Sequence, residues 1–266
     1  GVVMREGESV KQGYHVVQEG DYHQLDPGRT ALETLQRVGR HLGATPLKTG
    51  RRRAVFEPEV VATLLGILVY SLSGRALAEG KSRLEGKLGQ RVASPLITVV
   101  DDATLQGALG SRPFDSEGTP SRRVTLIEDG VLRSFLHNSA TSRRTGQPNT
   151  GHASRTYSST LDVAPTNLLL LPGKGLEDAD GVLVTDLMGV HAGSNPISGD
   201  VSVQAMGLEV VGRESRPVDD FAISFNLFEL LLRVSGVGSK ATWEYQGRSA
   251  FKVPTISVED VSFAGS

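Results

Sequence analysis

The fold of this chain is decided by residues 56–74, which read FEPEVVATLLGILVYSLSG. Proline at the first helical position and acidic residues in the first turn favour a helix that begins near Pro58. The apolar side chains between Val60 and Leu72 surround the helix axis on nearly every side, which is typical of a helix buried within a domain. This apolar run is shorter than the roughly 20 residues that a membrane span requires. The stretch therefore predicts one central buried helix.

Around this helix the sequence predicts a domain of short strands and few helices. An Asp-Pro pair opens a run of apolar residues at helical spacing, which predicts a helix over 27–42. An Asp-Gly pair at 129–130 predicts a β-hairpin, because glycine accepts the positive φ of the turn. An amphipathic stretch predicts a further helix over 221–234. Strands are predicted over 52–56, 96–100, 167–171, 182–186, 201–211 and 255–263. Helices and strands that occur in blocks favour the α+β class over a doubly wound sheet.

The charge balance of the 266 residues excludes several classes of protein. Lys and Arg total 28 and Asp and Glu total 30, for a formal net charge of -2, whereas a protein that coats nucleic acid or an anionic membrane needs a basic surplus. The chain has no cysteine, which excludes disulfides, thiolate metal sites and a cysteine nucleophile. The first residues lack the basic and apolar segments of a signal peptide. We therefore expect a cytoplasmic protein that binds neither nucleic acid nor membranes.

Few polar residues are spaced as an active site would require. The six histidines include no pair at the i, i+4 spacing that places two imidazoles on one helix face for zinc. Asp115 and Glu117 lie in a loop bounded by proline and glycine. There they could bind a cation or a partner's arginine, or they could cap backbone N–H groups. The polar segment 139–160 is predicted to be a long loop without regular structure.

Three stretches, taken together, resemble the TldD/PmbA (TldE) family. They are residues 56–60 with the apolar helix up to Gly74, residues 110–118 (GSRPFDSEG) with the hairpin at 128–132, and residues 195–202 (NPISGDVS) with the strand that follows. The resemblance is to the C-terminal half of such proteins, and the N-terminal domain typical of the family is not in this sequence. We therefore expect a polar segment and helix (1–45) that lead into a TldD/PmbA C-terminal-like domain (46–266). The expected fold is α+β, with a curved antiparallel sheet around the buried central helix.

The resemblance implies a cytoplasmic two-subunit assembly that trims unfolded peptides. In its metal-bearing subunit, TldD, a His-Glu-x-x-x-His helix and a late cysteine bind zinc, whereas the partner TldE/PmbA lacks these ligands. Here Leu65, Gly66 and Tyr70 occupy the positions of the zinc motif, and residues 60–78 contain neither His nor Glu. The late cysteine would fall near 235–238, where the sequence has none. A hydrolytic zinc needs about three protein ligands, so we expect no catalytic residue, metal site or cofactor in this chain, and zinc in a partner subunit.

Residues at the start of the strand predicted over 201–211 are candidates for peptide binding. A glycine followed by alternating residues suits a strand edge that receives an extended peptide by β-augmentation, and it suits equally a core strand after a tight turn. The candidate peptide-strand or interface residues are Asp115, Glu117, Asn195, Ser198, Gly199 and Asp200.

The resemblance implies a TldE/PmbA-like non-catalytic subunit of a TldD/TldE metallopeptidase complex. The expected partners are a TldD-like subunit in a heterodimer, or a second copy in a homodimer, together with an unfolded peptide substrate. One alternative is an active metallopeptidase in which His137, His152 and His191 converge in space. The other is a regulatory binding protein without proteolytic activity, because the family also carries the label "modulator of DNA gyrase".

Overall fold

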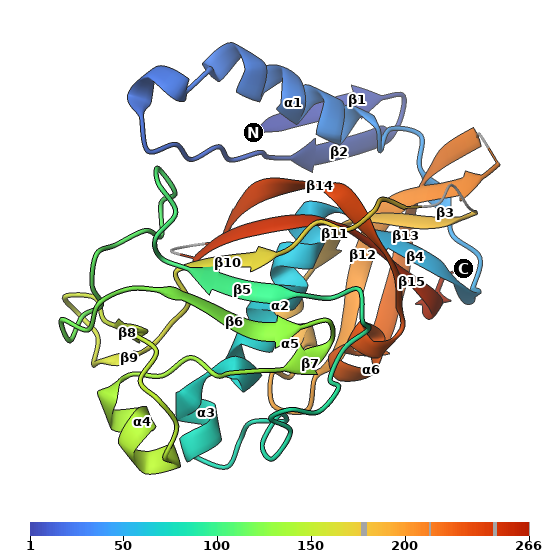
Figure 1. Cartoon of the computed structure of the whole chain (residues 1–266). Helices are drawn as coiled ribbons and strands as arrows, with labels where there is room; N and C mark the ends of the chain where they lie inside the picture. The colour runs from blue at the N-terminus through green and yellow to red at the C-terminus, as the bar shows by residue number, and fades with distance from the viewer. Residues whose placement is uncertain (177–179, 213, 247–248, 266) are drawn as a thin grey trace.

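The computed structural model describes residues 1–176, 180–212, 214–246 and 249–265. The chain opens with the hairpin of β1 (Val2–Glu6) and β2 (Ser9–Gly13), a 3-10 turn (Tyr22–Gln24) and helix α1 (Pro27–Gly39). We call β1, β2 and α1 the N-terminal unit; Figure 1 shows it above the strands of the main sheet. The predicted helix over 27–42 is α1, whose first turn is capped by the Asp26 carboxylate, which accepts a hydrogen bond from the Arg29 backbone N–H at 2.9 Å. The sequence did not predict the hairpin.

The main sheet has eleven strands among the described residues, and five of them close into a barrel. Its strands are β3 (Thr45–Pro46), β4 (Gly50–Phe56), β5 (Val99–Asp102), β6 (Arg123–Glu128), β7 (Val131–Leu132), β10 (Asn167–Leu170), β11 (Gly181–Met188), β12 (Asp200–Val211), β13 (Glu214–Asn226), β14 (Val234–Gln246) and β15 (Ser249–Ala264). The order β13-β12-β11-β4-β15 is closed by a further pairing of β13 with β15, and β10, β5, β6 and β7 extend the sheet from β15. Closure gives each of these five strands two neighbours within the barrel, whereas β14 lies outside it and pairs with β15. The predicted α+β fold with a curved sheet is confirmed; most pairs are antiparallel, and β11–β4, β10–β15 and β13–β3 are parallel.

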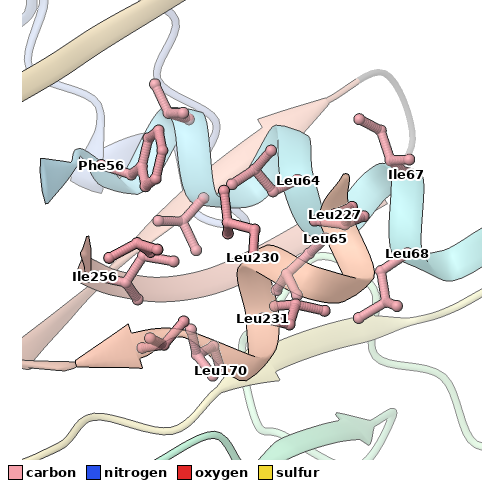
Figure 2. Packing of buried hydrophobic residues seen from close by; sticks show 14 of the residues in the cluster. Phe56, Leu64, Leu65, Ile67, Leu68, Leu170, Leu227, Leu230, Leu231 and Ile256 are labelled. Atoms are coloured by element: carbon pink, nitrogen blue, oxygen red, sulfur yellow. The ribbon is translucent and has the colours of Figure 1, made fainter. Parts of the chain in front are cut away.

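Helix α2 (Pro58–Leu72) is the predicted central helix, and it contacts β11, β14 and β15. Its leucines pack against those of α6 (Leu227–Leu232), as Figure 2 shows for Leu65 and Leu231. The prediction that α2 is buried on every side was wrong on one face. Gly66 is exposed, and Glu59, Thr63 and Tyr70 are half-buried along the same stripe. This stripe carries the small and polar side chains of the helix, so leaving it partly open loses little apolar burial.

The predicted helix over 221–234 was wrong. Strand β13 continues to Asn226, and only Leu227–Leu232 is helical before β14 begins. Phe221 and Ile223 are fully buried at strand period, and they pair with β12. Pairing with a neighbouring strand overrides the helical pattern of the local sequence. The Asn226 side chain then starts α6 by accepting a hydrogen bond from the Phe228 backbone N–H at 3.1 Å.

The remaining elements are short. They are α3 (Gly74–Ala78), α4 (Ser139–Thr145), β8 (Ala153–Ser154), β9 (Asp162–Val163) and α5 (Val190–Gly193). The segment 139–160 therefore contains a helix and was wrongly predicted to lack structure. The reason is a reciprocal cap, in which Asn138 accepts from the Thr141 N–H at 2.8 Å while Thr141 Oγ1 accepts from the Asn138 N–H at 3.1 Å. The predicted hairpin is confirmed, with a positive φ of 77° at Gly130. Within the described residues, every helix is too short or too polar to traverse a bilayer.

Candidate functional site

The accessible stripe of α2 faces β14. Gln246 on β14 donates a hydrogen bond from Nε2 to Thr63 Oγ1 of α2 at 2.7 Å. A Cβ atom at Gly66 would lie 3.4 Å from the Gln246 side-chain oxygen. The Gln246 side chain thus spans the open stripe of α2 from Thr63 to Gly66.

Next to this stripe lies a cleft between the N-terminal unit and the barrel. It consists of two cavities of about 360 Å³ and 650 Å³ that share Tyr14, Glu59, Asp186 and Leu187. Cavities of this size are typical of ligand sites. The smaller cavity is lined by Tyr14, His15, Val16, Glu59, Val60, Thr63, Asp186, Leu187, Glu244, Tyr245 and Gln246. We call it the inner cleft.

The N-terminal unit is held over this cleft by ion pairs with the start of α2. Arg40 makes two hydrogen bonds of 2.7 Å to the Glu57 carboxylate, and Arg37 makes one of 2.7 Å to Glu59. Lys11 of β2 pairs with Asp219 of β13. Because a two-pronged arginine–carboxylate contact fixes orientation as well as distance, these pairs set the position of the roof of the cleft.

Two carboxyl groups in the cleft have raised pKa values. Burial, and then the neighbouring Glu59 charge, raise the pKa of Asp186 to about 6, although the residue remains accessible to water within the cleft. Burial likewise raises the pKa of Glu244. Within the described part of the chain, no basic side chain lies within 4 Å of either carboxylate, in contrast to Glu57 and Glu59. Desolvation without a cationic partner disfavours the charged form, which explains both directions.

The residues that the resemblance assigns to the zinc-motif positions do not fit a zinc ion. Leu65 is 3 % exposed and packs in the hydrophobic core (Figure 2). Neither Leu65 nor Gly66 carries a donor atom on its side chain, and Tyr70 offers only a phenol. Imidazole, thiolate or carboxylate donors are what zinc requires. Where the late cysteine would fall, Ser235 Oγ lies within hydrogen-bonding distance of Ser257 Oγ at 3.1 Å and of a Glu259 carboxylate oxygen at 3.0 Å. Among residues 1–176, 180–212, 214–246 and 249–265, no three His, Asp or Glu side chains are grouped to hold a metal.

Of the three histidines considered as alternative ligands, two are buried neighbours and one is exposed. His152 Nε2 lies 2.8 Å from Asp101 Oδ1, and its Nδ1 lies 2.9 Å from Thr150 Oγ1. His137 Nδ1 lies 3.1 Å from Thr141 Oγ1. His191 is exposed on α5. His137 and His152 are thus held in an internal polar network, and the described residues include no metal-holding group that unites them with His191.

Asp115 and Glu117 bind backbone N–H groups. The Asp115 side chain is 3 % exposed and accepts from the N–H groups of Glu117, Thr119 and Ala153, each at 2.9 Å. Glu117 accepts from the Ser139 N–H at 2.8 Å, at the start of α4. These contacts correspond to the capping alternative that the sequence left open, since they join the loop to β8 and α4.

Asn195, Ser198, Gly199 and Asp200 form the turn that leads into β12. Asn195 Oδ1 accepts from the Ser198 N–H at 3.2 Å, and Ser198 Oγ donates to Asp200 at 2.7 Å. A groove of about 930 Å³ borders Asn195 and Asp200. The β12 edge that a peptide would need is already used, because β12 pairs with β13, and the chain before the turn bridges to it through Ser194 and Val201. The structure thus has the core strand that the sequence left as the alternative, and it places no contact between this turn and Asp115 or Glu117 among the described residues.

Replacing Gly199 by alanine is expected to destabilise the fold by about 2 kcal/mol. The residue has a positive φ of 84°, and an added Cβ would lie 2.5 Å from the Phe228 ring. Gly118 is a matched control, because its φ of 81° is similar and nothing lies within 4 Å of its added Cβ. Gly118→Ala should cost about 1 kcal/mol, from backbone strain alone. Urea unfolding of the two variants measures the difference, and equal losses would show that contact with Phe228 contributes nothing.

Sequence reasoning missed the acidic residues of the cleft. Asp186 was placed at the end of the strand predicted over 182–186 but was given no role. Glu244 lies in β14, which was not predicted as a strand, although Thr242, Glu244 and Gln246 alternate with Trp243 and Tyr245. That alternation of polar and aromatic residues was the available signal.

Comparison with known proteins gives consistent matches. The profile of the PmbA/TldA metallopeptidase C-terminal domain matches residues 49–265. A metalloprotease of Methanothermobacter thermautotrophicus is 31 % identical over 258 residues, which cover 91 % of this chain and 54 % of that protein. The crystal structure of TldE from Thermococcus kodakarensis superposes with a TM-score of 0.87 at 27 % identity, over 99 % of this chain and 61 % of that one. A proposed modulator of a DNA gyrase from Thermotoga maritima gives a TM-score of 0.86 at 27 % identity, over 98 % and 60 %. The chain spans about half the length of the curated relatives that it matches along most of its own length.

Proposed function

Because this chain belongs to the PmbA/TldA metallopeptidase C-terminal domain family, we propose that it acts as the non-catalytic, TldE/PmbA-like subunit of a TldD/TldE metallopeptidase complex. One observation carries the proposal. The α2 positions that the resemblance assigns to the zinc motif carry Leu65, Gly66 and Tyr70 here, and none of these side chains supplies an imidazole, thiolate or carboxylate for the metal.

In this proposal the zinc belongs to a TldD-like partner. The present chain pairs with that partner, helps to enclose the space in which unfolded peptides are cut, and helps to admit them. The cleft between the N-terminal unit and α2 supports a role in peptide admission, because it borders Glu59 and Thr63 on the open stripe of α2 and has the size of a ligand site.

The test uses this chain and a TldD-like protein from the same organism, each purified alone and then mixed. We expect the two to co-elute on size exclusion, with stoichiometric zinc only in the TldD-like protein. An unfolded peptide should be cleaved by the mixture and not by this chain alone. A mixture that contains the TldD-like protein with its zinc-motif glutamate replaced by glutamine is the matched control, and it should be inactive.

Two results would contradict the proposal. The first is peptide cleavage by the present chain alone with stoichiometric zinc, which mutation of His137, His152 or His191 abolishes. The second is full cleavage by the TldD-like protein alone with no complex at micromolar concentrations. A stable self-complex without affinity for the TldD-like protein would favour the homodimer.

A further inference from the structure

The inner cleft runs along the edge of strand β14. Glu244, Tyr245 and Gln246 are consecutive, and all three line the cavity. Side chains in a strand alternate between faces, so three successive residues can border one cavity only where it meets the strand edge. Tyr14, His15 and Val16, which follow β2 outside any strand or helix, line the same cavity. The inner cleft is therefore bordered by the edge of β14 and by this connecting segment.

The β14 edge is unpaired at this cavity. From Ala241 to Gln246, β14 pairs with β15 on one side only. Closer to its start, the other side is bonded by Gly173 and Gly175, which donate to the carbonyls of Gly238 and Val237. Among the described residues no backbone hydrogen bond fills that side at 241–246. An extended peptide can add to such an edge through main-chain hydrogen bonds, without a requirement for its sequence.

The charged side chains of the inner cleft determine which charge a bound peptide should carry. Glu59 is already paired with Arg37, and the imidazole of His15 lies 3.2 Å from Glu33 while burial lowers its pKa. The carboxylates of Asp186 and Glu244 face the same cavity with no basic side chain of the described residues within 4 Å. Among the described residues these two carboxylates thus have no ion-pair partner in the cavity, although the positive charge of Arg37 acts on both at longer range.

We propose that the inner cleft binds an extended peptide as an added strand on β14 and prefers peptides that carry a positive charge, an ammonium or a guanidinium, which Asp186 and Glu244 bind. This inference rests on the proposed function for its account of why a peptide enters the cleft. It adds a substrate preference that acts in this subunit.

The experiment measures peptide affinity of the present chain alone, at low salt, by fluorescence anisotropy. The probes are dye-labelled pentapeptides of the pattern Thr-Val-X-Val-Thr, in which X is lysine or norleucine, each with a blocked or a free amino terminus. We expect the blocked lysine peptide to bind at least tenfold more tightly than the blocked norleucine peptide. A free norleucine peptide that binds as tightly as the lysine peptide would identify the terminal ammonium as the group bound.

Two isosteric substitutions test whether Asp186 and Glu244 cause the preference for a positively charged peptide. In the double variant Asp186→Asn, Glu244→Gln, the tenfold difference should fall to less than twofold, while the norleucine peptide binds as before. Glu229→Gln is the control, because Glu229 is exposed on α6 and outside the cleft. Hydrogen exchange of the wild-type chain with bound lysine peptide should slow at 241–246, and this readout needs no variant to fold.

Equal affinity for all the peptides, a preference that persists in the double variant, or unchanged exchange at 241–246 would each overturn the inference. These outcomes are independent of the proposed function, which depends on complex formation and cleavage by the mixture. Cleavage by the mixture without charge preference in this chain would reject only the inference. Selective binding without a TldD-like complex would reject only the proposed function.

Discussion

Replacement of Asp101 by alanine is expected to lower the free energy of unfolding by about 3 kcal/mol, because it leaves several buried hydrogen-bonding groups without their partner, each at a cost of about 1–3 kcal/mol. Asp101 lies on β5 and is 0 % exposed. Its Oδ1 lies 2.8 Å from His152 Nε2, and its Oδ2 accepts from the Thr166 N–H at 2.8 Å. The Thr166 hydroxyl also donates to Asp101. Alanine would leave the Thr166 donors and the imidazole of His152 buried without this partner.

The effect would extend beyond one strand, because this carboxylate joins three segments. His152 precedes β8, Thr166 precedes β10, and Asp101 lies within β5. Urea unfolding monitored by circular dichroism measures the loss. Asp101→Asn is the matched control, since its amide oxygen can still accept one hydrogen bond, and it should cost clearly less. A loss below 1 kcal/mol for Asp101→Ala would show that water replaces the missing acceptor.

Acidification from pH 7 to about pH 4 is expected to remove about 3 kcal/mol of stability for each of His41 and His137. Burial, and then the nearby Arg40 charge, lower the pKa of His41 to about 4. Burial, and then His152, lower the pKa of His137 to about 4. His137 is 0 % exposed, and its Nε2 has no hydrogen-bond partner in the described structure.

Stability falls with pH because the pKa of each of these histidines is about 4 in the folded chain and near 6.5 in the unfolded chain. Above pH 6.5 both the folded and the unfolded states carry neutral imidazoles, so the contribution to stability is complete. Between pH 6.5 and 4 the unfolded chain takes up protons that the buried histidines of the folded chain do not, and stability falls as the pH falls. The raised pKa of Asp186 has the opposite effect over part of this range, which reduces the net loss.

The pH dependence of urea unfolding measures this effect in the wild-type chain and in His137→Gln. In the variant the free energy of unfolding should fall less steeply between pH 6.5 and 4.5, with a slope that corresponds to up to one fewer proton taken up on unfolding. His191→Gln is the control, because His191 is exposed on α5, and it should follow the wild type. If NMR showed the His137 imidazole titrating near pH 6.5, burial of His137 would not contribute to the acid instability.

Local patterns in the sequence determined several elements correctly. The apolar run of α2, the Asp26 cap of α1 and the Asp-Gly turn between β6 and β7 all depend on residues within a few positions of one another. Helical period, caps and tight turns act over that distance. The resemblance that identified the family also drew on short motifs, and the family profile matches residues 49–265.

The sequence by itself therefore determined the α+β class, the central helix and the absence of His and Glu from residues 60–78. Only the tertiary structure decided that 221–226 is strand and that, among the described residues, the start of β12 is covered on both sides whereas β14 has an unpaired edge at 241–246. It also brought Asp186 and Glu244 into one cavity with Tyr14. The physical reason is that strand pairing and cleft walls join residues far apart in the chain, as where β4 pairs with β15, and such contacts leave no periodic signal in either partner alone.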